Sequence, residues 1–140
     1  MTTLRGACHC GSISVEFETA IDPSALPLRA CQCSFCRKHG ARTASDPGGR
    51  LRVSVRDQEL LVRYRFALGV TDFLVCKTCG VYVAATMEAD AGPIGTVNVN
   101  VFDERAPLLR NAEPVSYFRE TAEERKARRA GKWTPVDLPR

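Results

Sequence analysis

Three cysteines, Cys31, Cys33 and Cys36, lie within six residues, and this stretch limits the chain more than any other. Thiols this close in sequence cannot each reach a separate disulfide partner without strain, but all three can converge on one metal ion. We therefore interpret the trio as a zinc site with three protein ligands.

Four more cysteines form two outer pairs, Cys8-His9-Cys10-Gly11 and Cys76-Lys77-Thr78-Cys79-Gly80. Each outer pair ends in a cysteine followed by glycine, which lets backbone amides turn toward metal-bound sulfurs without a Cβ clash. The central trio has no such glycine. Four thiolates close a tetrahedral structural site, whereas three leave a position open for water or substrate, as in catalytic zinc. The sequence therefore predicts two Zn²⁺ ions per chain, with Cys8, Cys10, Cys76 and Cys79 as the structural site.

A simpler alternative joins Cys33 and Cys36 to Cys76 and Cys79 in one zinc ribbon, with Cys31 as a buried thiol. That alternative leaves the well-formed first pair without a partner. The two histidines, His9 and His39, flank cysteines and could bind metal, but seven thiols already suffice. We expect both histidines to lie beside the ligands or at the surface.

The length of 140 residues fits one domain, residues 1–140, with a β core over about 5–118 and a helical tail over about 119–140. No N-terminal apolar segment and no run of about 20 apolar residues is present, so we expect no membrane span. We therefore expect a cytoplasmic location. Thiols stay reduced there, so the spacing of the cysteines favours metal over disulfides, and their odd number also fits full disulfide pairing badly.

The formal charge of +4 invites a nucleic-acid interpretation, but it counts all seven cysteines as neutral. Thiolates on two Zn²⁺ ions would cancel most of this excess. The remaining positive charge gathers in the C-terminal tail, over residues 119–132, without interleaved aromatic residues. This pattern is more typical of a solubilising face or a partner contact than of a nucleic-acid reader.

Alternating apolar residues predict about six strands. The segments are 11–18, 51–56, 60–66, 71–75, 81–87 and 94–102, with a hairpin turning near Asp57 and Gln58 that joins the second to the third. Two prolines before the trio predict that it lies on a loop, and the polar segment 41–50 could form a mobile flap beside it.

One helix is predicted from Thr121 to about Ala130, because Thr121 and Glu124 have capping-box spacing. Its only apolar side chains are alanines, so we expect a surface helix with Trp133 as its anchor.

The complete cysteine pattern resembles the glutathione-dependent formaldehyde-activating enzyme family, which also contains centromere protein V. The resemblance covers about residues 5 to 135. It extends to three further motifs, which are Tyr64-Arg65-Phe66, Gly80-Val81-Tyr82 and Trp133-Thr134-Pro135.

The resemblance implies a mainly β, Mss4-like zinc-bound fold with a short C-terminal helix. It implies that the outer four cysteines bind a structural zinc, and that Cys31, Cys33 and Cys36 bind the zinc associated with glutathione and catalysis. The family reaction is a carbon–sulfur lyase-type condensation of formaldehyde with glutathione, which gives S-(hydroxymethyl)glutathione.

Zinc held by three thiolates activates water weakly, but it can take a fourth sulfur and keep that sulfur deprotonated. Our hypothesis is that glutathione, or a related thiol, takes this position and attacks formaldehyde or another small aldehyde. Arg37 and Lys38 are expected to attract the carboxylates of the tripeptide.

The alternative is an inactive zinc-stabilised module that contacts a protein or nucleic-acid partner. An open metal position beside a pocket favours the enzyme, and a filled position on a flat surface favours the module.

Overall fold

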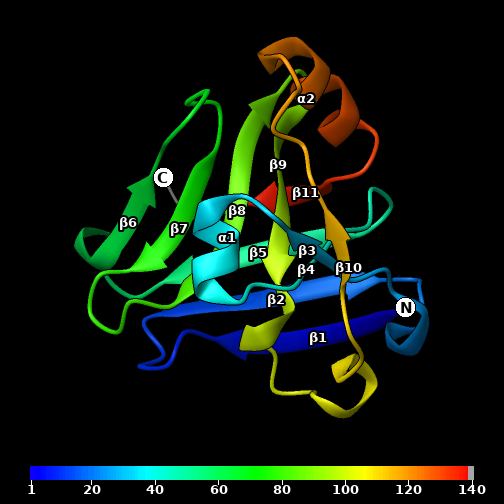
Figure 1. Ribbon diagram of the computed structural model, residues 1–140. Helices are drawn as coiled ribbons and strands as arrows, with labels where there is room; N and C mark the ends of the chain where they lie inside the picture. The colour runs from blue at the N-terminus through cyan, green and yellow to red at the C-terminus, as the bar shows by residue number, and fades with distance from the viewer. Residues whose placement is uncertain (139–140) are drawn as a thin grey trace.

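A computed structural model describes residues 1–138 of the chain, which form mainly β-strands (Figure 1). The strands are β1 (Thr2–Ala7), β2 (Ile13–Thr19), β3 (Arg29–Cys31), β4 (Thr43–Ala44), β5 (Arg50–Val55), β6 (Leu61–Tyr64), β7 (Asp72–Cys76), β8 (Tyr82–Ala89), β9 (Gly92–Asn98), β10 (Glu113–Val115) and β11 (Thr134–Asp137). The α-helices are α1 (Ser34–His39) and α2 (Ala122–Ala130), and short 3₁₀ turns span Pro23–Ala25, Gln58–Leu60, Val99–Val101 and Ala106–Leu108.

Strand β9 is the junction of the sheet. The main path has the order β1-β2-β5-β11-β9-β4-β3-β10, and β6-β7-β8 joins it at β9. Strand β8 pairs along one edge of β9, whereas β11 and β4 pair with successive parts of the other edge. Strand β11 also pairs in parallel with β5, so a segment near the C-terminus connects the two halves of the sheet. The domain boundaries expected from the sequence stay a prediction.

The main hydrophobic core lies where the β1-β2-β5 strands face the strands around β9. Its fully buried side chains include Phe17 and Leu51 from the first group and Leu74, Val83 and Val97 from the second. Strand β8 is buried over Tyr82–Met87, as expected for a strand covered on both faces.

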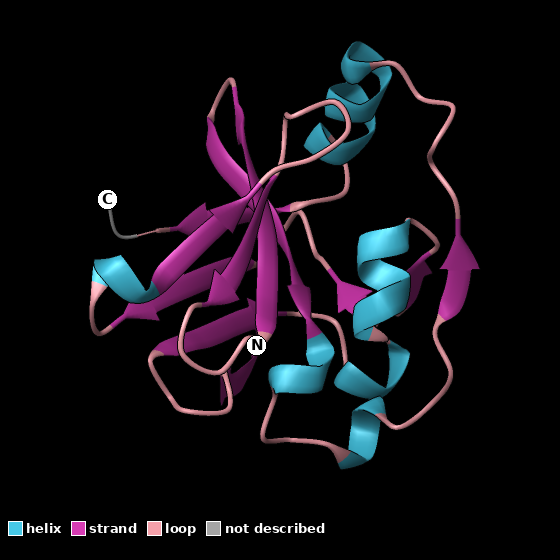
Figure 2. Ribbon diagram, turned by 60° about the vertical axis from the view of Figure 1, so that its left-hand side comes forward, coloured by secondary structure: helices cyan, strands magenta, loops and turns pink. Residues whose placement is uncertain are grey.

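A second, smaller apolar cluster combines residues of β7 and β8 with Cys36 and Trp133. Figure 2 shows the strands as a fan, with α1 to its right, α2 above α1, and β10 rising on the outer side toward α2. The cysteine trio thus lies beside this second cluster, whereas Cys8 and Cys76 belong to the main core.

Several sequence predictions are confirmed. The mainly β class is correct, and the alternating segment before residue 20 is β2 with Ile13, Val15 and Phe17 buried. Helix α2 begins after Thr121 with both bonds of the capping box: the Glu124 amide donates to Thr121 Oγ1 at 3.1 Å, and the Thr121 amide donates to Glu124 Oε1 at 3.0 Å. The Trp133 amide donates to the Arg129 carbonyl at 2.7 Å, which holds the tryptophan against the helix end.

Four sequence predictions are wrong. The expected β5–β6 hairpin does not form, because β5 pairs with β2 and β11 whereas β6 pairs with β7. The trio is not a loop, since Cys36 lies within α1. Residues 41–50 are not a free flap: Ala44 and Asp46 are buried, and Asp46 accepts a hydrogen bond of 2.6 Å from the Thr19 hydroxyl. The described residues form eleven strands rather than about six.

None of the helices within residues 1–138 has the length and apolar character needed to cross a membrane.

A substitution at Gly6 tests how closely β1 approaches the segment after β9. A Cβ atom at Gly6 would lie 1.9 Å from the Val101 carbonyl oxygen, and that oxygen belongs to the backbone. We expect Gly6→Ala to lower the free energy of unfolding by about 3 kcal/mol, because the backbone must shift to accept the methyl group. Urea denaturation measures the change. Gly131→Ala is the control, because its nearest neighbour would lie 3.8 Å away, and equal stability of the two variants would contradict the contact.

Candidate metal centres and the adjoining cavity

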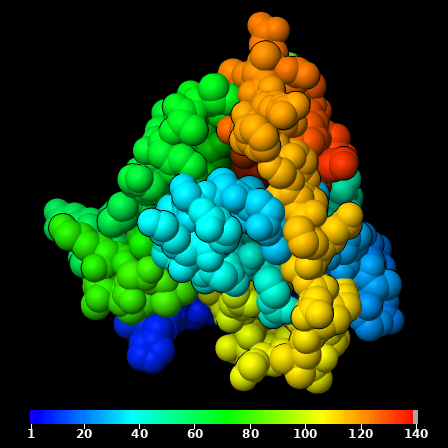
Figure 3. Space-filling model, viewed as in Figure 1, coloured from blue at the N-terminus to red at the C-terminus, as the bar shows by residue number. Residues whose placement is uncertain are grey.

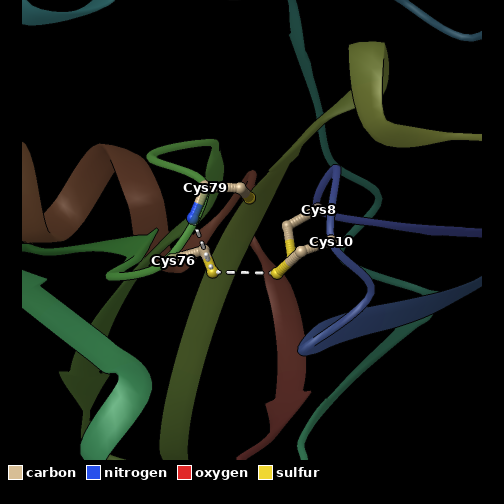
Figure 4. Close-up of side chains that lie close together, drawn as sticks. All are labelled: Cys8, Cys10, Cys76 and Cys79. Carbon is tan, nitrogen blue, oxygen red and sulfur yellow. Dashed lines mark hydrogen bonds between the residues drawn. The ribbon is translucent and has the colours of Figure 1, made fainter.

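The two outer cysteine pairs meet at one point, although they lie far apart in sequence (Figure 4). Cys8 follows the end of β1 and Cys76 is the last residue of β7. The Cys10 sulfur lies 3.7 Å from the Cys8 sulfur and 3.6 Å from the Cys76 sulfur, and the ligand atoms of all four cysteines lie within 4.8 Å of one another. This grouping excludes the one-ribbon alternative, since Cys33 and Cys36 belong to a separate cluster.

The glycines after these pairs have a backbone conformation that other residues rarely adopt. Gly11 and Gly80 have φ angles of 83° and 78°, in the left-handed region that favours glycine. The Ile13 amide donates to the Cys8 sulfur at 3.3 Å, and the Cys79 amide donates to the Cys76 sulfur at 3.5 Å. Amide donors toward sulfur stabilise thiolates, which is the ionisation state that metal binding requires.

The outer cluster fits a tetrahedral metal ion. Bonds of about 2.3 Å from zinc to sulfur place the sulfurs about 3.8 Å apart, close to the measured separations. Hydrogen bonding to Ser12 lowers the pKa of Cys10 to about 6, whereas burial raises the pKa of Cys8 to about 11. Four crowded thiols therefore cannot all ionise at neutral pH without a cation, and a divalent ion removes this conflict.

The central trio is positioned by a strand end and the first turn of a helix. Cys31 ends β3, Cys33 is the N-cap of α1, and Cys36 lies in the first turn. The Cys33 sulfur accepts a hydrogen bond of 3.3 Å from the Cys36 amide, a cap role that serine or aspartate usually fills. The three sulfurs lie within 4.8 Å of one another.

The thiols of the trio compete for one negative charge. Hydrogen bonds from Cys31 and Cys36 lower the pKa of Cys33 to about 2, and the corresponding interactions raise the pKa of Cys31 and Cys36. Only a bound cation allows all three to be thiolates together. Within residues 1–138 the cluster contains no fourth cysteine, histidine or carboxylate ligand. A metal ion held there would keep one coordination position for an outside ligand.

The trio opens into a cavity of about 550 Å³, and Cys31, Cys33 and Cys36 all line it. In Figure 3 this face is hollowed where the cyan trio segment, the green segment near residue 70 and the orange segment leading into α2 come together. A volume of this size suits a small molecule.

Aromatic side chains form the apolar wall of the cavity, from Phe66, Phe73 and Tyr82. The Phe66 and Phe73 rings stack with centroids 4.8 Å apart, and Phe35 contacts both from the side of α1. Burial, followed by the nearby trio thiols, raises the pKa of Tyr82 well above its usual value. The phenol is therefore a neutral hydrogen-bond donor.

Two predicted substrate-binding residues lie outside the cavity lining. Arg37 and Lys38 are exposed on α1, and neither lines the cavity. Neither histidine belongs to a cysteine cluster among the described residues, and the ring of exposed His39 packs 4.4 Å from that of Phe35. The role of Arg37 and Lys38 stays a prediction.

The sequence interpretation missed the arginines that do line the cavity. Arg29 comes from β3, whereas Arg125, Arg128 and Arg129 come from α2. The spacing of the three helical arginines could have predicted a common face, because helical residues three and four apart lie on one side of a helix. That face is turned toward the cavity rather than to solvent.

Comparison with known proteins agrees with this geometry. Residues 3–119 match the model of a family described as glutathione-dependent formaldehyde-activating enzyme. A crystal structure of a Rhodobacter sphaeroides protein is similar, with a TM-score of 0.60 and 32% sequence identity, over 79% of this chain and 99% of that one. No curated protein matches the chain at a significant level. Since the family match covers most of its length and includes all seven cysteines, from Cys8 to Cys79, the chain belongs to the glutathione-dependent formaldehyde-activating enzyme family.

Proposed function

We propose that this chain is a zinc-dependent enzyme that condenses glutathione with formaldehyde to give S-(hydroxymethyl)glutathione. The observation that carries the proposal is the trio: three sulfurs near enough to share one ion, with no fourth ligand in the cluster among residues 1–138, line a cavity of substrate size. Membership of the family supports the choice of thiol and aldehyde.

Both clusters fit zinc, because every available ligand is a cysteine sulfur. Cys8, Cys10, Cys76 and Cys79 would hold a structural ion, and Cys31, Cys33 and Cys36 would hold the ion used in the reaction. When bound by the trio, zinc supplies a coordination position that favours a deprotonated sulfur ligand.

The cavity residues hold the reactants together and limit the access of water. Phe66 and Phe73 give the site an apolar wall beside the trio. In the reaction the substrate thiol gives up its proton to solvent, its sulfur forms a bond to the aldehyde carbon, the carbonyl π electrons pass to oxygen, and this oxygen takes a proton from solvent. Tyr82 lines the same cavity and can donate a hydrogen bond to that oxygen. Orientation of two small reactants accounts for much of the acceleration of such a reaction.

Arg37 and Lys38 fit a role in attraction rather than in contact. Their exposed charges on α1 lie next in sequence to Cys36. Exposed charges of this kind raise the rate at which an anionic substrate arrives, and salt weakens the effect.

The binding-module alternative expects a filled metal position on a flat surface. The three-sulfur cluster beside a cavity supports the enzyme instead. Either function requires reduced thiols, which is why we propose a cytoplasmic location.

Zinc content tests the two clusters separately. We expect two zinc ions per chain, and one after either Cys76→Ser or Cys33→Ser, as measured by elemental analysis. Cys76→Ser is expected to cost about 4 kcal/mol or more of unfolding free energy, because it opens the closed site that joins distant strands. Cys33→Ser should cost much less, since its cluster joins residues close in sequence. Equal losses of stability would contradict the structural and catalytic assignments.

The reaction itself is tested by following S-(hydroxymethyl)glutathione formation with exchange NMR at equilibrium. The wild-type protein with zinc is expected to accelerate exchange, and Cys33→Ser is expected to return it to the uncatalysed rate. Lys77→Ala is the control, because Lys77 is exposed beside a ligand of the outer cluster and does not line the cavity. Retained acceleration in a folded Cys33→Ser variant would eliminate the mechanism.

A further inference from the structure

The cavity that contains the trio carries an excess of positive side chains on another part of its lining. Four arginines line it, Arg29, Arg125, Arg128 and Arg129, against one carboxylate, Glu120. Three of these arginines belong to α2, which follows the last residue of the family match at 119.

Glu120 neutralises two of the four arginines. Its carboxylate accepts bonds of 2.7 and 3.0 Å from Arg128 and one of 3.3 Å from Arg125. Arg128 also lies over the Tyr117 ring, with its guanidinium carbon 3.5 Å from the ring centroid. Arg125 and Arg128 thus form a fixed ion-pair network with Glu120.

Arg29 and Arg129 form no such ion pair within the described residues. Neither guanidinium is within 4.0 Å of a carboxylate among residues 1–138, and Arg29 donates to the Ser45 hydroxyl. Arg129 is only 8% exposed, lies 4.1 Å from the Trp133 ring centroid and donates to the Thr71 hydroxyl. Its Nε has no hydrogen-bond partner within the described chain. Burial lowers the pKa of Arg129 to about 10, so it stays charged at neutral pH.

A buried charge without a counterion is costly, and proteins usually pair it. An arginine in this state on the lining of a cavity is therefore suited to an anion that arrives with a ligand. Guanidinium groups bind carboxylates through two parallel hydrogen bonds, which fixes orientation as well as charge.

We propose that Arg29 and Arg129 bind a carboxylate of the thiol substrate, so that the cavity selects thiols that carry a carboxylate. The inference rests on the proposed function for the role of the reacting sulfur, but anion binding itself does not require the reaction. The residues with this role include one from α2, so selectivity depends partly on a segment beyond the family match.

A ligand with a blocked sulfur separates binding from chemistry. Trp133 is the single tryptophan of the chain, and it lines the cavity in contact with Arg129. Titration of the zinc-loaded protein with S-methylglutathione should therefore change its fluorescence saturably. The diethyl ester of the same compound, which lacks both carboxylates, should bind at least about tenfold more weakly, because a charge-assisted hydrogen bond contributes about 1.5 to 3 kcal/mol.

The variants Arg29→Gln and Arg129→Gln should each weaken the binding of S-methylglutathione about tenfold or more and leave that of the diester almost unchanged. A general disturbance of the cavity would weaken both ligands alike. Lys126→Gln is the matched control, because it removes one positive charge from the exposed side of α2 without touching the lining. If Arg129→Gln does not fold, as judged by thermal denaturation, Arg29→Gln still decides the proposal.

Equal affinity for the acid and the diester would overturn the proposal, and so would variants that keep the preference for the acid. Tight binding of inorganic phosphate with no binding of S-methylglutathione would assign the arginines to another anion and would equally overturn it. Selective binding without any acceleration of adduct formation would support the carboxylate site and contradict the proposed function, so the two failures are distinguishable.

Discussion

The convergence of four sulfurs from two distant parts of the chain is the constraint on which the rest of the structure depends. Cys10 and Cys76 are 66 residues apart, yet their sulfurs lie 3.6 Å apart. Each pair lies where two successive strands are joined: Cys8 and Cys10 between β1 and β2, and Cys76 and Cys79 at the end of β7 and in the turn before β8. A metal ion there would fix one half of the sheet against the other at a single point. Its binding free energy would offset the entropy that the chain loses when so long a loop closes.

Fixing that point also positions the cysteine trio and the cavity. Strand β8 starts just after Gly80 and carries Tyr82 and Ala85 into the cavity lining. Its neighbour β9 pairs with β4, which pairs in turn with β3, and β3 ends at Cys31. The trio therefore reaches its place through successive strand pairings that begin beside the closed cluster. A site on such elements is held more firmly than one on a free loop.

Local patterns in the sequence predicted what local physics determines. The glycines at 11 and 80 marked the closed cluster, and the capping box marked α2, because both depend on neighbouring residues alone. Alternation also found the buried face of β5, but it does not specify a partner, so the pairing of β5 with β2 and β11 was not predictable. Helix α1 was missed because its N-cap is the Cys33 thiol, and the arginines of α2 were taken for a solvated face because α2 buries Arg129 against Trp133 in place of an aliphatic residue.

The charges of the cavity suggest why its parts lie where they do. A divalent ion held by three thiolates leaves about one negative charge at the trio, which disfavours carboxylates beside it. Arg29 and Arg129 favour them elsewhere on the same lining. A thiol that carries carboxylates would then enter with its charged groups at the arginines and its sulfur toward the trio. Opposite preferences at separate points orient a flexible ligand more strongly than attraction at one point, and orientation is the main requirement of a reaction that joins two small molecules.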